Sequence, residues 1–104
     1  MIRAIDPCDI LTTLAEPTRL AALALLWDGQ EHCVCELMQR LGVTQSRMSR
    51  HMAALKNAGL VTDRRDAQWV RYRRAANIPP AVTTLVEAAL ALAAQNTPDT
   101  KAAA

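Results

Sequence analysis

The sequence is short of the features that mark several large classes of protein. Among 104 residues it has no phenylalanine, only three aromatic residues and only three glycines. Its longest weakly polar stretch, residues 81–94, contains two threonines and a glutamate, so it is too short and too polar to span a bilayer. No long apolar run leads to a small-residue cleavage site near the N-terminus, so no secretory signal is expected. We therefore expect a cytoplasmic protein of one domain that does not bind a membrane.

Cysteine is also scarce, and the three that are present are Cys8, Cys33 and Cys35. In a reducing compartment they are expected to be free thiols or ligands rather than a disulfide framework. The spacing Cys-x-Cys, with no preceding strand, disfavours a dithiol redox enzyme. No other combination of nucleophile, base and orienting residue is recognisable. The chain is predicted not to be an enzyme and to need no organic cofactor.

The positive charge is concentrated in one part of the chain, although the formal net charge is only +2. Residues 40–74 contain nine basic and two acidic residues, a net charge of +7, whereas the remainder carries −5. A solvent-exposed charged face usually mixes both signs, so this segregation favours a positive surface that binds phosphates. Nucleic acid is the predicted partner.

Two prolines predict the starts of the first two helices. Pro7 follows Asp6 and Pro17 follows Glu16, so proline stands at the first helical position behind an acidic residue in both cases. Proline fits this position because its missing N–H would be unpaired there anyway. Two short helices are therefore expected before the basic segment.

The last predicted helix runs from residue 81 to about residue 95. Its apolar surface is larger than so short a chain can cover alone, which fits a partner subunit. We expect residues 1–95 to form one domain whose first and last helices dimerise, and residues 96–104 to form a disordered C-terminal tail.

Two further helices form a predicted helix-turn-helix. The first starts near residues 32–35 and ends at Gly42, and the second is capped by Thr44 and runs to about Ala58. The start of the second helix would enter the major groove, where glutamine pairs with adenine and arginine with guanine. The predicted DNA contacts on this helix are Thr44, Gln45, Ser46, Arg47, Ser49 and Arg50.

A β-hairpin is predicted after this helix, with strands at residues 61–62 and 69–72 joined by the polar segment 63–68. Its arginines are suited to contact phosphates or a minor groove, as a wing does. Trp69 is interpreted as a packing residue, because one aromatic does not make a stacking platform. The expected fold is mainly α with a small β-hairpin, a dimeric winged helix-turn-helix. The wing residues expected to contact DNA are Arg64, Arg65, Arg71 and Arg73.

Over roughly residues 11–92 the sequence resembles the ArsR/SmtB family of metal-responsive repressors. The resemblance implies a homodimer that binds palindromic double-stranded operator DNA and dissociates when an inducing ion binds. It also places His51 in the Ser-Arg-His of the recognition helix, where a DNA or structural role is expected. The segments that carry the resemblance are Leu14–Leu20, Glu31–Leu37, Gln45–Met52, Gly59–Val61 and Trp69–Arg73.

Cys33 and Cys35 are the predicted ligands of the inducing ion, because thiolates prefer soft metals and metalloids. Residues two apart on a regular helix point about 200° apart, so shared ligation would distort the start of that helix and re-aim the recognition helix. The arsenic-sensing members that the chain resembles have a third cysteine where this sequence has Met38.

The third ligand is expected to be Cys8, as some cadmium- and lead-sensing relatives complete the pair from an N-terminal arm, of the same or the partner subunit. Three sulfurs suit As(III) or Sb(III), the favoured inducers. Two alternatives remain on the same fold: a repressor responsive to Cd(II) or Pb(II), and a thiol-redox sensor in which Cys8 is oxidised with Cys33 or Cys35.

Overall fold

A computed structural model describes residues 5–96, which form five helices and one three-stranded antiparallel sheet. The C-terminal tail was predicted for residues 96–104. Its first residue, Asn96, is the last residue of the final helix, and residues 97–104 lie outside the described part of the chain. The elements, in chain order, are α1 (Pro7–Leu14), α2 (Pro17–Leu26), β1 (His32–Cys33), α3 (Val34–Leu41), α4 (Gln45–Asn57), β2 (Val61–Asp66), β3 (Trp69–Arg74) and α5 (Pro80–Asn96).

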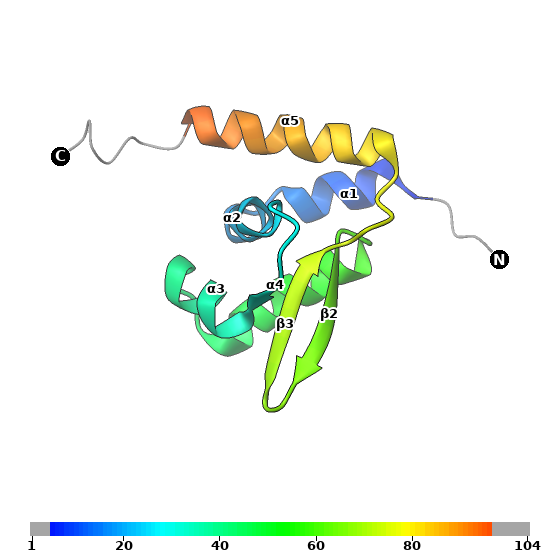
Figure 1. Ribbon diagram of the computed structural model, residues 1–104. Coiled ribbons are helices and arrows are strands. Elements are labelled where there is room, and N and C mark those ends of the chain that lie inside the picture. Colours follow the sequence, from blue (N-terminus) through cyan, green and yellow to red (C-terminus); the bar gives the residue numbers. More distant parts are fainter. Residues whose placement is uncertain (1–4, 97–104) are drawn as a thin grey trace.

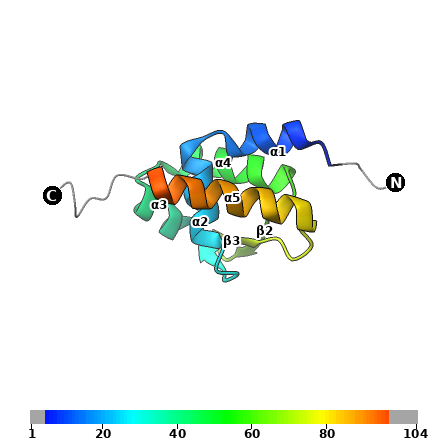
Figure 2. The ribbon, with the colours of Figure 1, turned by 90° about the horizontal axis from the view of Figure 1, so that it is seen from above.

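The helices stack in layers, and the hairpin of β2 and β3 extends away from them. Helix α5 lies across one end of the molecule beside α1, and the tip of the hairpin is at the opposite end (Figure 1). Seen from above, α1 and α5 run side by side, and α5 passes over α2 (Figure 2). Helix α2 is central, because Leu23 and Leu26 are fully buried and pack in one core with Val86 of α5. Within residues 5–96 no helix is long and apolar enough to cross a membrane.

The caps predicted from sequence form as expected. The Asp6 carboxylate accepts a hydrogen bond from the Cys8 N–H at 2.8 Å, and Glu16 accepts from two backbone N–H groups at the start of α2. Gly42 ends α3 with a left-handed φ of +66°, a conformation that glycine adopts without steric cost. Thr44 caps α4 through its hydroxyl. These helices begin and end where local side-chain chemistry satisfies the unpaired backbone groups.

Strand β1 was not predicted, although α3 starts within the expected range of residues 32–35. His32 and Cys33 pair with Tyr72 and Arg71 of β3, so the strand order is β1-β3-β2 and α3 begins only at Val34. Two residues are too few to show strand periodicity. The strand exists because β3 offers backbone partners to a segment almost forty residues earlier in the chain.

The hairpin strands are longer than predicted. Strand β2 extends to Asp66 and β3 to Arg74, so the connecting turn is only Ala67 and Gln68. The segment looked like a loop because polar residues on both faces give no alternating pattern. Ion pairs near the ladder support it instead: Lys56 Nζ lies 3.0 Å from an Asp63 oxygen. Ala67 takes a φ of +57°, which is unfavourable for a residue with a Cβ.

Trp27 joins the end of α2 to both α5 and the base of the hairpin. Its indole Nε1–H donates to Glu87 of α5 at 3.0 Å, and the Arg74 guanidinium lies 3.9 Å from the ring centroid. This cation–π contact binds Arg74 into the framework. The orientation of the hairpin is therefore coupled to the helical layers.

Candidate nucleic-acid interface and ion site

Helix α4 is the second helix of the helix-turn-helix, the recognition helix, and its first turns present a polar face to solvent. The opposite face is buried, because Met48, Met52 and Leu55 are fully covered and follow helical spacing. The predicted DNA contacts on α4 and its cap are all exposed, and they are Thr44, Gln45, Ser46, Arg47, Ser49 and Arg50.

Arg47 and Arg50 are the free cations of this face. Within residues 5–96 neither guanidinium has a hydrogen bond or an ion pair with another side chain or with the backbone. Binding to an acceptor therefore does not first require breaking an intramolecular contact. An arginine in this state can pair with a guanine edge or a phosphate oxygen.

His51 differs from its neighbours on α4. Its side chain is only 16% exposed, and Nδ1 lies 3.2 Å from a Glu16 carboxylate oxygen and 3.4 Å from Arg19 Nη1. Both partners belong to the start of α2 and the residue that caps it. Of the two roles expected for His51, this geometry supports the structural one.

Three of the four predicted wing arginines are engaged within the chain. Arg64 donates two hydrogen bonds to the Glu31 carboxylate, at 2.9 and 2.7 Å. These hydrogen bonds hold the pKa of Glu31 below its ordinary value. Arg71 Nε donates to Asp66 at 2.7 Å, and Arg73 Nε donates to the carbonyl of Gly29. Of the four wing arginines, Arg65 alone has a guanidinium without such a partner within the described residues.

Trp69 lies at the first position of β3, next to the turn, and is 36% exposed. The packing role expected for it is therefore incomplete, because over a third of the side chain remains in contact with solvent. Its register partner on the neighbouring strand is Asp66, and its exposure beside the turn of the hairpin makes it a candidate contact in addition to the predicted ones.

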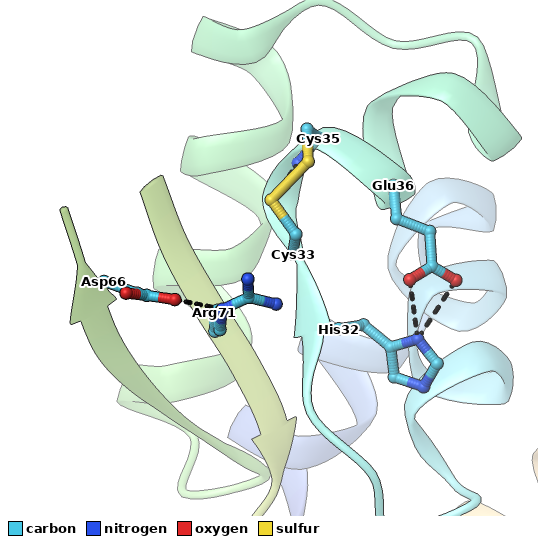
Figure 3. The surroundings of a disulfide bond; sticks show 6 residues. All are labelled: His32, Cys33, Cys35, Glu36, Asp66 and Arg71. Carbon is cyan, nitrogen blue, oxygen red and sulfur yellow. Dashed lines mark hydrogen bonds and ion pairs between the residues drawn. A yellow bond between two sulfur atoms is a disulfide. The ribbon is translucent and has the colours of Figure 1, made fainter. Parts of the chain in front are cut away.

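Cys33 and Cys35 meet where β1 runs into α3, and the structure joins them in a disulfide (Figure 3). This differs from the expectation that Cys33 and Cys35 are free thiols. Cys33 has extended backbone angles and is the N-cap of α3, with its sulfur accepting from the Cys35 N–H at 3.2 Å. Because only Cys35 is within the helix, the predicted 200° separation does not apply, and both sulfurs can reach one point without unwinding a turn.

His32 lies beside the sulfur pair but is held by two carboxylates. Its Nδ1 is 3.0 Å from Glu36 and its Nε2 is 3.0 Å from Asp28. Burial alone would lower the pKa of His32, but the hydrogen bonds that its ring donates to Glu36 and Asp28 raise the pKa above its ordinary value. Both ring nitrogens are therefore occupied, and His32 is poorly placed to become an ion ligand.

Cys8 is exposed at the start of α1 and is not brought to the sulfur pair. The start of α1 lies away from the start of α3 in both ribbon views (Figures 1 and 2). Residues 5–96 contain no group of three or more His, Cys, Asp or Glu side chains that could hold a metal ion. A site with three sulfurs is thus not assembled within one chain.

A shallow surface pocket connects the sulfur pair to the helix-turn-helix. Cys35 and Met38 line it on the α3 side, and the turn residues up to Thr44 complete it. Thr44 is the N-cap of α4. On the other side, Cys33 is the register partner of Arg71 in the hairpin. The two sulfurs therefore adjoin both elements that carry the exposed basic residues.

Comparison with known proteins identifies relatives over most of the chain. The family model "Bacterial regulatory protein, arsR family" matches residues 16–63. The arsenic resistance transcriptional regulator ArsR2 of Pseudomonas putida is 40% identical over 83% of this chain and 75% of its own length. The arsenical resistance operon repressor of Escherichia coli is 37% identical over 80% of this chain and 71% of its own length.

Among solved structures, a homodimeric winged helix-turn-helix DNA-binding domain of Mycobacterium bovis superposes with a TM-score of 0.67 and 26% identity. It covers 93% of this chain and 94% of its own. The predicted winged helix-turn-helix fold is confirmed. The matched proteins are transcriptional regulators, which also confirms the prediction that the chain is not an enzyme.

Proposed function

Because the chain belongs to the arsR family of bacterial regulatory proteins, we propose that it is a repressor that releases its operator when As(III) or Sb(III) binds Cys33 and Cys35. The names of its relatives support arsenic as the class of inducer. The donor set fits, since two sulfur atoms already lie together and Cys35 is exposed. A reduced pair supplies two thiolates, and such ligands form stable bonds to soft metalloids.

The observation that carries this proposal is the position of the pair between the two DNA-binding elements. Cys33 belongs to the strand that pairs with the wing, and Cys35 adjoins the turn that leads into the recognition helix. A small displacement at the junction therefore reaches both elements through direct contacts. An inducer works only if it binds one conformation better than the other, and this junction is where such a difference arises.

Ligation would change the local bonding of Cys33. Its sulfur accepts the Cys35 N–H as the cap of α3, and a sulfur shared with an ion is a weaker acceptor. Next to it, Glu31 holds Arg64 of the wing. A shift of β1 alters the distance between these two side chains. Coupling of about 1–3 kcal/mol, a 5- to 150-fold change in DNA affinity, is the usual range for such linkage.

We assign the third ligand to Cys8 of the partner subunit, which requires a dimer. Exposed apolar side chains on two helices support one, with Leu11 50% exposed on α1 and Leu92 59% exposed on α5. An apolar groove lined by residues of α2 and α5, including Leu20 and Leu90, adjoins them. A second copy that covers this surface would bury it.

Two other functions use the same residues. Cd(II) or Pb(II) could replace the metalloid on the same sulfurs. The disulfide in the structure favours a redox sensor of a form not expected from sequence, with Cys33 bonded to Cys35 instead of to Cys8. In that reaction two thiols lose two protons and two electrons to a peroxide, which is reduced to water.

The test is a fluorescence-anisotropy titration of the reduced protein on a duplex selected from random-sequence DNA. As(III), Sb(III), Cd(II) and Pb(II) are added separately, and As(III) or Sb(III) is expected to release the DNA at the lowest concentration. The double variant Cys33→Ser/Cys35→Ser should bind DNA but no longer respond. Cys8→Ser should lose sensitivity to As(III), and an unchanged response would remove Cys8 from the site. Release by peroxide alone would establish the redox function instead.

A further inference from the structure

Three side chains join the recognition helix to the junction between α1 and α2. They are Glu16, Arg19 and His51. We propose that His51 is a positioning residue that orients the recognition helix through this Glu16–Arg19–His51 cluster, and that it does not contact DNA. The proposal rests on the proposed DNA-binding function and is independent of the ion site.

The cluster is partly shielded from water. The side chain of His51 is 16% exposed and that of Glu16 is 27% exposed. By contrast, Arg47 and Arg50, which are on α4 like His51, are exposed. With a proton on Nδ1, the imidazole of His51 donates to the Glu16 carboxylate 3.2 Å away. A contact of this kind is screened less than one at the open surface.

Glu16 is itself fixed by the backbone of α2. One carboxylate oxygen accepts the Thr18 N–H at 3.0 Å and the other accepts the Arg19 N–H at 3.1 Å. Burial alone would raise the pKa of Glu16, but these backbone donors, with the charges of His51 and Arg19, hold it below its ordinary value. The carboxylate that meets His51 is therefore charged and has little freedom to move.

Arg19 fixes the other side of the junction. Its Nε donates to the carbonyl of Thr13 at 2.7 Å and its Nη2 donates to the carbonyl of Thr12 at 3.4 Å. Both carbonyls are in the last turn of α1, where the last acceptors lack the usual helical donors, although the Thr12 carbonyl also accepts the Ala15 N–H at 3.2 Å. Glu16 thus accepts hydrogen bonds at the start of α2, and Arg19 donates hydrogen bonds at the end of α1. His51 is the member of the cluster that belongs to α4.

This arrangement relates the recognition helix to the proposed dimer frame. Helix α1 packs beside α5, so a residue that ties α4 to the end of α1 sets the angle of α4 to these two helices (Figure 2). In a dimer the two recognition helices must reach half-sites about one helical turn of DNA apart. A change in tilt would move Arg47 and Arg50 away from both half-sites at once.

Salt dependence separates a positioning residue from a DNA contact. Each cation removed from a phosphate reduces the slope of log K against log salt by about one. His51→Ala is expected to lower operator affinity about 5- to 30-fold while the slope stays that of the parent protein. Arg65→Ala is the matched control, since this exposed arginine has no partner in the described chain and should reduce the slope.

The conservative variant His51→Asn keeps an amide donor near the position of Nδ1 and is expected to recover most of the lost affinity. Unchanged affinity in His51→Ala, or a slope reduced as in Arg65→Ala, would overturn the proposal. Should His51→Ala fail to fold, Glu16→Gln tests the same contact from outside the recognition helix. It should weaken DNA binding at an unaltered slope, and parental affinity in that variant would equally overturn the proposal.

Discussion

Glu31→Gln should strengthen operator binding, because Glu31 competes with DNA for a wing arginine. Arg64 makes two bonds to this carboxylate, at 2.9 and 2.7 Å, and the carboxylate offsets the charge and occupies two of the donors that Arg64 would offer a phosphate. A charged, two-point contact is stronger than a single neutral hydrogen bond, but both side chains are at the surface, where ion pairs are weak. We therefore expect a gain of about two- to fivefold in affinity rather than a larger one.

The salt dependence should change in the same variant. If Arg64 gains a phosphate contact on each subunit, the slope of log K against log salt steepens by about 0.9 per contact. The measurement is fluorescence anisotropy of an operator duplex between about 50 and 200 mM salt, a range in which phosphate contacts have large effects. An affinity and a slope equal to those of the parent protein would refute the idea that Glu31 withholds Arg64.

A control must separate this local effect from the loss of one negative charge. Asp9→Asn removes a charge from the exposed start of α1, which lies away from the tip of the hairpin (Figure 1). General attraction between protein and DNA would strengthen binding in both variants. Only the loss of the specific contact predicts a steeper slope in Glu31→Gln and an unchanged slope in Asp9→Asn.

Three further predictions concern stability and are read from urea unfolding. Glu16→Ala should lower the free energy of unfolding by about 1 kcal/mol at pH 7, because the cap of α2 is lost. The folded-state pKa of Glu16 is lowered, so its contribution is present above the ordinary value of 4.5 and is lost as the pH falls through the folded pKa. The difference between variant and parent should therefore shrink below pH 4.5, and a constant difference would contradict this assignment. Ala67→Gly should stabilise the protein by about 0.5–1 kcal/mol, because φ is +57° at this turn, and a loss of stability would show that the turn tolerates alanine. Met52→Ala should cost about 2–5 kcal/mol, since this side chain is fully buried, and a cost below 1 kcal/mol would mean that the core repacks around it.

The recognition helix was the part of the fold most completely predicted from sequence. Thr44 caps it, and Met48 and Met52 follow the spacing of one helical face, so exposure of the intervening polar residues follows directly. These signals act over one or two turns. The same holds for the starts of α1 and α2, where an acidic cap precedes proline.

The sheet was predicted less well because its contacts are not local. Strand β1 has two residues, and its partner in β3 lies far along the chain. The polar residues of β2 gave no alternating pattern, although the strand continues to Asp66. The same limit applies to the wing arginines. Their number is evident from sequence, but the pairing of Arg64 with Glu31 depends on the fold.

The sequence by itself determined that two sulfurs stand two residues apart beside a basic helix-turn-helix, because composition, spacing and caps are local properties. Only the tertiary structure decided that Cys33 precedes the helix and meets Cys35, and that Cys8 lies apart from both within one chain. It also turned His51 toward the α1–α2 junction. These outcomes depend on which distant elements pack together, and packing is set by the summed contacts of the whole core rather than by neighbours in sequence.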